Sequence, residues 1–144
     1  MATAESLTGG RLAALLTEAP GASQTYVGGV VSYATSVKTG VLGVPERLVE
    51  EHGVISAECA LAMARGVTAL TGATYGLSTT GVAGPERQEG HPAGTVFVGL
   101  VGPGVATALA LELVGSRPEI QARTCLEALS AVVDNLTGKK PTLG

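Results

Sequence analysis

The sequence predicts an α/β sandwich built around a mixed β-sheet. Short segments rich in valine and other β-branched residues alternate along the chain with segments whose apolar residues recur every three or four positions. This alternation is typical of helices layered on a sheet. Two strand patterns, residues 94–101 and 105–114, are joined by Gly102-Pro103-Gly104. Such a short connection predicts a hairpin, so at least one strand is antiparallel to its neighbour.

Size and composition indicate one domain, residues 1–144, with residues 138–144 as a tail. The apolar fraction is 45%, with only 3% aromatic residues, so we expect a core of aliphatic side chains that needs no disulfide or structural metal. The net charge of −3 and the lack of a Lys/Arg cluster argue against a nucleic-acid surface. No stretch reaches the ~18–20 apolar residues that span a membrane, and no secretory signal is visible. We therefore expect a soluble, cytoplasmic protein.

The first half of the chain is predicted to contain three helices and one strand after the opening segment. A short helical stripe covers residues 12–16, and residues 26–33 form a strand pattern. Residues 35–43 are interpreted as a polar connection. Residues 45–53 begin with Pro and end with Gly, which favours a short helix. Ser56 is then expected to cap a longer helix, whose apolar positions follow the helical period.

The second half adds a strand at residues 75–80, which runs into a glycine-rich loop, the hairpin, and a last helix. That helix has an apolar stripe at alternating steps of four and three: Ala122, Leu126, Leu129, Val133 and Leu136. Ser116 and Glu119 fit a capping box. Because Pro118 disfavours helical geometry at the residue before it, we expect Arg117 to lie outside the helix and Pro118 in its first turn.

Metal and common cofactor motifs are absent from the sequence. His52 and His91 lie far apart with no carboxylate at ligand spacing, so no metal site is predicted. The phosphate-loop, dinucleotide-binding and serine-elbow motifs are also missing. Cys59 and Cys125 share no motif spacing and lie in apolar patterns, which favours buried free thiols.

Hydroxyl side chains and one lysine follow the predicted strands, and ligands of α/β sheets bind at the carboxyl ends of strands. These residues are Ser6, Ser32, Tyr33, Lys38, Thr79 and Thr80. A lysine whose pKa is lowered by burial can act as a base toward a serine. The ordinary alternatives are a helix cap for Ser6, a solvated Lys38 and a surface ion pair for Arg117. These patterns alone indicate an enzyme or a binding domain for a small molecule.

Several motifs, in order along nearly the whole chain, make it resemble the CinA C-terminal domain family. They are Thr3-Ala4-Glu5-Ser6-Leu7-Thr8-Gly9-Gly10, Pro20-Gly21-Ala22-Ser23, Gly28-Gly29-Val30-Val31-Ser32-Tyr33, Lys38, Gly40-Val41-Leu42-Gly43-Val44, Thr80-Gly81-Val82-Ala83-Gly84-Pro85 and Gly94-Thr95-Val96. The resemblance implies a three-layer α/β/α sandwich around a mixed, mostly parallel sheet of about five strands, one of them antiparallel. It also implies a homo-oligomer, with a dimer expected.

The activity implied by the resemblance is that of a nicotinamide-nucleotide amidohydrolase in pyridine nucleotide salvage. Nicotinamide mononucleotide and water would give nicotinic acid mononucleotide and ammonia, without metal or organic cofactor. Carried over by position, Ser6 falls on the nucleophile, Lys38 on the base, and Tyr33 on a hydroxyl that completes their hydrogen-bond network. Thr80 falls on a substrate or oxyanion contact. Arg117 falls on an arginine that we assign to the substrate phosphate, with Arg123 as the alternative.

The backbone can supply the remaining groups that this chemistry needs. An amide carbonyl requires N–H donors for its developing oxyanion, and the glycine loop, including Gly81 and Gly84, or the Ser6–Gly10 turn could provide them. A phosphate favours a helix start, which suggests a role for Gly9 and Gly10 as well.

The sequence departs from the family pattern in four places. Leu7 stands where Cys is common, and Ser116 where an acid often precedes the arginine. A helix and part of a strand that usually precede the Ala-Glu-Ser motif are missing, as is the nucleotide-pyrophosphatase-like domain of full-length CinA proteins. The substitutions at Leu7 and Ser116 remove no proposed catalytic group, but the missing N-terminal helix motivates an alternative: a non-catalytic nucleotide-binding or protein-interaction module linked to competence or the DNA-damage response.

Overall fold

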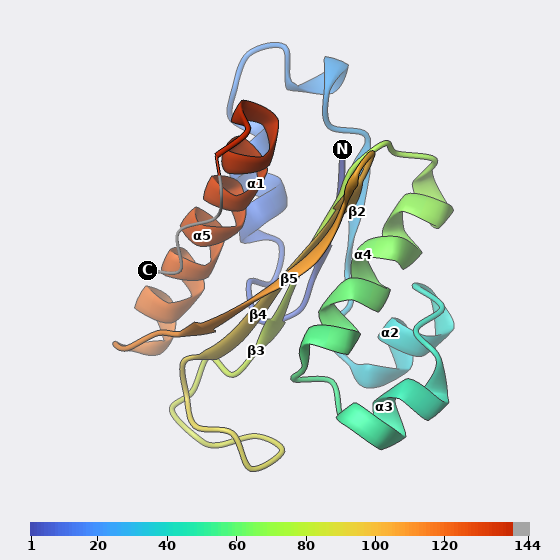
Figure 1. Cartoon of the computed structure of the whole chain (residues 1–144). Helices are drawn as coiled ribbons and strands as arrows, with labels where there is room; N and C mark the ends of the chain where they lie inside the picture. Colours follow the sequence, from blue (N-terminus) through green and yellow to red (C-terminus); the bar gives the residue numbers. More distant parts are fainter. Residues whose placement is uncertain (140–144) are drawn as a thin grey trace.

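The computed structural model describes residues 1–139 and confirms the predicted sandwich (Figure 1). Five strands form one sheet in the order β2-β1-β3-β4-β5. Their bounds are β1 Ala2–Glu5, β2 Gly28–Val31, β3 Gly76–Gly81, β4 Thr95–Gly102 and β5 Val105–Glu112. β1 pairs in parallel with β2 and β3, whereas β4 pairs antiparallel with β3 and β5. The predicted hairpin is therefore β4–β5, and β4 is the strand that runs against the others.

Helices cover both faces of this sheet (Figure 1). On one face lie α1 (Arg11–Thr17) and α5 (Arg117–Thr137); on the other lie α2 (Thr35–Gly40), α3 (Glu46–His52) and α4 (Ala57–Thr71), and a 3₁₀ turn spans Ala22–Gln24. Each face has its own apolar cluster. Leu12, Leu77 and Ile120 belong to the first, and Ala4, Met63 and Val67 to the second. Across residues 1–139 we find no helix whose length and apolar character would let it span a bilayer.

Close packing of α4 on the sheet depends on glycine. A Cβ atom at Gly76 would clash with the carbonyl oxygen of Ala64, and one at Gly99 would clash with that of Ala60. The helix itself begins as predicted, because the Ser56 side chain accepts a hydrogen bond from the backbone N–H of Cys59 (3.1 Å). This close contact brings the N-terminal end of α4 toward the loops at the carboxyl ends of the parallel strands.

Two local predictions are wrong. The expected polar connection at residues 35–43 contains helix α2, which is too short to show an apolar period and lacks a capping side chain. Helix α5 begins at Arg117, not after it, with Ser116 as its N-cap. Both hydrogen bonds of the capping box form, one from Glu119 N–H to Ser116 Oγ (3.4 Å) and one from Ser116 N–H to the Glu119 carboxylate (3.1 Å). The box outweighs the unfavourable effect of Pro118. Of the predicted tail, residues 140–144 lie outside the described part.

Three residues of the apolar stripe of α5 face away from the core, whereas Leu129 packs against it. Leu126, Val133 and Leu136 are 60%, 56% and 62% exposed. The residues that α5 buries against the sheet are smaller and partly polar: Ile120, Gln121, Thr124, Cys125, Ala128, Ala131 and Val132. The helix therefore carries two apolar surfaces, and the stripe with the more regular spacing is the outer one.

Neighbouring valines on α5 should respond oppositely to the same substitution. Val132 is 7% exposed and Val133 is 56% exposed. We expect Val132→Ser to lower the free energy of unfolding by roughly 2–4 kcal/mol, because it removes buried methyl groups and buries a hydroxyl. Val133→Ser should change it by no more than about 0.5 kcal/mol. Urea unfolding followed by circular dichroism measures both, and equal losses would contradict the orientation of α5.

Candidate active site

Ser6 follows directly after β1, in the middle of the sheet and at the carboxyl ends of its parallel strands. Its backbone N–H donates to the carbonyl oxygen of Thr79 (3.0 Å), which continues the pairing with β3. On the other side, the Glu5 carbonyl oxygen accepts from Ser32 N–H (2.7 Å). From α5, the buried Gln121 amide donates to the Leu7 carbonyl oxygen (3.0 Å). The backbone around Ser6 is therefore held from three directions.

The buried carboxylate of Glu5 organises the turn between Ser6 and α1. Its Oε1 accepts from Thr8 Oγ1 (2.6 Å), Gly10 N–H (3.2 Å) and Leu12 N–H (2.8 Å), and its Oε2 accepts from Ala13 N–H (3.0 Å). Glu5 thus satisfies the first N–H groups of α1, which has no capping side chain at its own N-cap, Gly10. Ser6 is left free of any capping role.

Lys38 reaches the Ser6 hydroxyl from α2. Its Nζ lies 3.0 Å from Ser6 Oγ, 2.7 Å from the Ser32 carbonyl oxygen and 3.3 Å from the Tyr33 carbonyl oxygen. Lys38 is only 1% exposed. Among the described residues no carboxylate forms an ion pair with it. A lysine in such surroundings is held by neutral acceptors alone.

Burial lowers the pKa of Lys38 below its ordinary value of 10.5, and the nearby Cys59 and Glu89 partly oppose this shift. The neutral amine is correspondingly easier to form than in water. Cys59 does not compete as a nucleophile, because burial raises the pKa of its thiol to about 11. Cys125 is similarly buried, with a pKa raised to about 11 by burial. Both thiols are free, as predicted.

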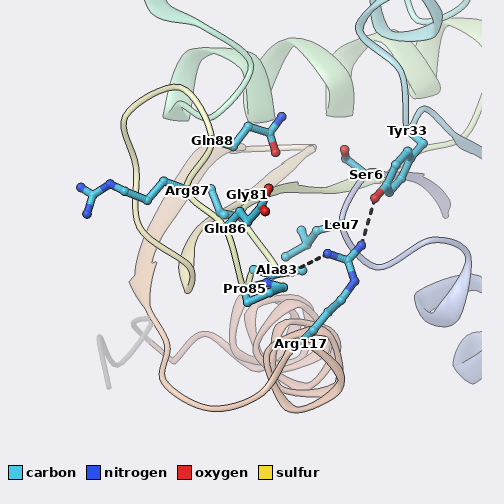
Figure 2. Close-up of a pocket in the computed structure, with 12 residues that line it drawn as sticks. Ser6, Leu7, Tyr33, Gly81, Ala83, Pro85, Glu86, Arg87, Gln88 and Arg117 are labelled. Atoms are coloured by element: carbon cyan, nitrogen blue, oxygen red, sulfur yellow. Dashed lines mark hydrogen bonds between the residues drawn. The ribbon is translucent and has the colours of Figure 1, made fainter.

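A cavity of about 390 Å³ opens beside Ser6 (Figure 2). This volume lies within the range of about 300–1,000 Å³ that is usual for small-ligand pockets. One wall consists of residues 81–88, from the last residue of β3 onward, and the remaining lining comes from Ser6, Leu7, Tyr33 and Arg117. The pocket therefore joins the carboxyl end of β1, the segment after β2, the loop after β3 and the start of α5.

Arg117 connects two sides of this pocket. Its guanidinium donates to the Gly84 carbonyl oxygen (2.6 Å) and to the Tyr33 hydroxyl oxygen (3.0 Å), and Figure 2 shows the guanidinium pointing toward Tyr33. Arg87 also lines the pocket, but its side chain extends away from this cluster (Figure 2) and donates to Gly90 O (3.1 Å). Arg123 lies elsewhere on α5 and pairs with Glu127 (3.0 Å). Arg117 is thus the arginine that joins the segment after β3 to Tyr33 in the lining of the pocket.

Three buried residues of the lining have a backbone N–H group without a protein acceptor among the described residues: Leu7, Ala83 and Gly84. Buried N–H groups are normally paired. Unpaired donors next to a serine hydroxyl are the groups that can accept a developing oxyanion.

The sequence matches the CinA C-terminal domain over residues 1–136. The chain belongs to this family. A CinA-like protein of Frankia casuarinae is 50% identical over 138 residues, which cover 96% of this chain and 32% of that relative. A putative competence-damage inducible protein of Geobacillus kaustophilus is 50% identical over 125 residues, 86% of this chain and 30% of the relative. The chain therefore spans about a third of the length of these curated relatives.

Solved structures of the CinA family share the fold. The competence damage-inducible protein A (ComA) of Klebsiella pneumoniae subsp. pneumoniae MGH 78578 superposes with a TM-score of 0.91 at 34% identity, covering 94% of this chain and 85% of that one. The competence/damage inducible protein CihA of Agrobacterium tumefaciens gives a TM-score of 0.88 at 32% identity, covering 92% and 82%.

The geometry does not support several roles expected from the family resemblance. The Tyr33 hydroxyl contacts Arg117, and only the Tyr33 backbone carbonyl reaches Lys38. Gly9 and Gly10 do not line the pocket, because their N–H groups donate to Ser6 O and to Glu5. Thr80 lies outside the lining as well, because its hydroxyl donates to Val54 O (2.6 Å). Gly81 and Gly84 do line the pocket.

The sequence did not predict the residues that hold the turn after Ser6 in place without lining the pocket. In the sequence Glu5 is only one residue of a motif. It caps α1 from a distance, since Ala13 lies eight residues further along the chain, whereas a usual capping side chain bonds to a residue two or three positions on. Thr8 and Thr79 join their hydroxyls (2.8 Å) behind the turn, a contact that strand pairing alone does not predict. Among residues 1–139, no three His, Cys, Asp or Glu side chains converge in a way that could hold a metal ion.

Removing the Glu5 carboxylate should destabilise the whole domain. In Glu5→Ala, the buried N–H groups at the start of α1 lose their acceptor, and we expect the free energy of unfolding to fall by roughly 3 kcal/mol or more. Glu5→Gln should cost less, about 1–3 kcal/mol, because its amide oxygen still accepts while its NH₂ faces a donor. Chemical unfolding measures both. The exposed Glu18→Ala serves as control, and an equal effect there would contradict the role of Glu5.

The lowered pKa of Lys38 predicts how stability depends on pH. Between the lowered folded-state pKa and the ordinary value of 10.5, the unfolded chain binds more protons than the folded one, so stability rises with pH in this window. We expect the free energy of unfolding of the parent, minus that of Lys38→Met, to increase as the pH approaches 10.5. Urea titrations at successive pH values measure this difference. A difference that stays constant with pH would contradict the prediction, and Lys139→Met controls for loss of a surface lysine.

Proposed function

We propose that this chain hydrolyses the carboxamide of nicotinamide mononucleotide, giving nicotinic acid mononucleotide and ammonia. The observation that carries the proposal is the contact of 3.0 Å between a buried lysine without a carboxylate partner and a serine hydroxyl at the mouth of a pocket. The family resemblance supplies the substrate. Because the chain spans about a third of its curated relatives, the proposal concerns this domain and not the complete relatives.

The surroundings of Lys38 suit a general base. A neutral amine has two N–H donors and one lone pair. The carbonyl oxygens of Ser32 and Tyr33 (2.7 and 3.3 Å) can take the two donors, which directs the lone pair toward the Ser6 hydroxyl. Lys38 then accepts the proton as Ser6 Oγ attacks the amide carbon.

The attack forms a tetrahedral intermediate whose oxyanion would be stabilised by the free N–H groups of Leu7, Ala83 or Gly84. The protonated Lys38 returns its proton to the amide nitrogen, the C–N bond breaks, and ammonia leaves an ester on Ser6. A water molecule, deprotonated by Lys38, attacks this ester. The C–O bond to Ser6 breaks, the serine recovers its proton, and the carboxylic acid is released.

Arg117 is the proposed binding group for the substrate phosphate. Of its five N–H donors, one is engaged with Gly84 and one with Tyr33, which leaves three for an anion. Planar guanidinium groups bind phosphate through paired hydrogen bonds. The contact with Gly84 ties this group to the same loop that offers the oxyanion donors. We further propose a homodimer, following the resemblance.

A second candidate is a non-catalytic module of a competence- or damage-inducible protein. The names of the relatives motivate it, since they refer to competence and damage and not to hydrolysis. Such a module would bind a nucleotide without consuming it.

Ammonia release from nicotinamide mononucleotide separates the two candidates. We expect turnover by the parent, a loss of roughly 10²–10⁴-fold in Lys38→Met, where the base is removed, and no covalent turnover in Ser6→Ala. Ser36→Ala on the exposed surface of α2 controls for loss of a hydroxyl. Arg117→Ala should raise KM for the mononucleotide but not for nicotinamide riboside, which lacks the phosphate.

Each variant should first be checked for folding by circular dichroism. Nucleotide binding by a folded parent without ammonia release would overturn the enzymatic proposal and favour the module. Full turnover by Ser6→Ala would overturn the mechanism alone.

A further inference from the structure

The loop that forms one wall of the pocket ends at a residue in an unfavourable backbone conformation. Glu89 has φ 50°. In the described part of the chain it is the one residue with a positive φ that is not a glycine. Together with Gly90 (φ 78°) it forms a tight turn, closed by hydrogen bonds between Gln88 and His91 (3.0 and 2.8 Å). Such turns favour Asn, Asp or Gly at both central positions. A glutamate there requires stabilisation from elsewhere.

The side chain of Glu89 supplies that stabilisation. Its Oε1 accepts from the N–H groups of Val54 (3.0 Å) and Ile55 (3.0 Å), and its Oε2 lies 3.3 Å from Val54 N. These N–H groups lie between α3 and the N-cap of α4, where the helix dipole favours a negative charge. Gly53 leaves room for the contact, since a Cβ atom there would come within 2.8 Å of Glu89 Oε1.

The start of this pocket wall is attached to Val54, the residue whose N–H group also binds Glu89. Thr80, the residue before Gly81, donates its hydroxyl to the carbonyl oxygen of Val54 (2.6 Å). Val54 is 6% exposed. The Val54 N–H group therefore binds Glu89, which follows the wall, and the Val54 carbonyl oxygen binds Thr80, which precedes the wall. The two ends of the segment 81–88 are therefore fixed at one buried residue, Val54.

We propose that Glu89 is a positioning residue that fixes the pocket wall, residues 81–88, against Val54 and so sets where a bound amide lies relative to Ser6. This inference rests on the proposed amidohydrolase function for its kinetic consequences. The wall contains the unpaired N–H groups of Ala83 and Gly84 and the carbonyl that Arg117 holds. A shift of the wall therefore displaces oxyanion donors and the phosphate-binding group together.

Glu89 is also linked to Lys38 by charge. The titratable groups that act on Lys38 are Cys59 from α4 and Glu89 from the wall loop, and both favour its protonated form against the larger effect of burial. Removing the carboxylate of Glu89 without changing its size removes this influence. The acidic limb of the pH profile should then move to lower pH.

The test compares Glu89→Gln with Glu51→Gln, an exposed glutamate of α3 that pairs with Arg47. We expect Glu89→Gln to lower kcat/KM for nicotinamide mononucleotide on the order of tenfold, less than the ~10²-fold cost of a full 1 Å misplacement, because the amide keeps one acceptor. The acidic limb of its kcat/KM profile should move to lower pH. Glu51→Gln should match the parent in both respects.

Hydrogen exchange measured by mass spectrometry tests the anchoring without any activity. Peptides covering residues 81–88 and residues 54–55 should exchange faster in Glu89→Gln than in the parent or in Glu51→Gln. Unchanged exchange would overturn the proposal, whatever the parent does with the nucleotide. Faster exchange with unchanged kcat/KM and pH profile would reduce Glu89 to a structural contact. Faster exchange in a protein whose parent releases no ammonia would retain the anchor and reject the amidohydrolase.

Discussion

The buried carboxylate of Glu5 gathers four donors that the fold would otherwise leave without acceptors. Three of them are N–H groups at the start of α1, and the fourth is the Thr8 hydroxyl. Because the carboxylate belongs to the last residue of the central strand, it attaches the helix to the sheet at the point where Ser6 leaves it. The usual capping task is thereby removed from Ser6. Its hydroxyl is available to Lys38 only because another side chain satisfies the helix.

The two buried charged side chains of this region are accommodated in different ways. Glu5 is surrounded by donors, whereas Lys38 is surrounded by two carbonyl oxygens and one hydroxyl. Had the two paired with each other, the lysine would stay protonated and could not serve as a base. Both sit next to the same serine, one before it in the chain and one facing it from α2. Because the Glu5 carboxylate and the Lys38 amine do not pair, the lysine can act as a base.

Features with a strong local signal could be predicted from the sequence. The cap of α4, the β4–β5 hairpin and the alternation of layers all depend on residues close together in the chain. The proximity of Ser6 and Lys38 followed from their places after parallel strands. The rest depends on tertiary contacts without a sequence signature: α2 is too short for an apolar period, and most of the regular stripe of α5 faces outward. The roles of Glu5 and Thr80 could not be foreseen, because all their partners except the Thr8 hydroxyl are backbone groups that any residue carries.

Rigidity is unevenly distributed around the pocket. Ser6 and Lys38 are buried, and β1, which leads into Ser6, is paired with a neighbour on both sides, so neither group moves without disrupting the sheet or α2. Tyr33, by contrast, is 61% exposed, and Arg117 holds it by a single hydrogen bond at the first position of a helix. The part that would do chemistry is fixed, while the part that would recognise a ligand is adjustable. A descendant of this sequence could change what it binds through substitutions at Tyr33 and Arg117 and still inherit Ser6 and Lys38 unchanged.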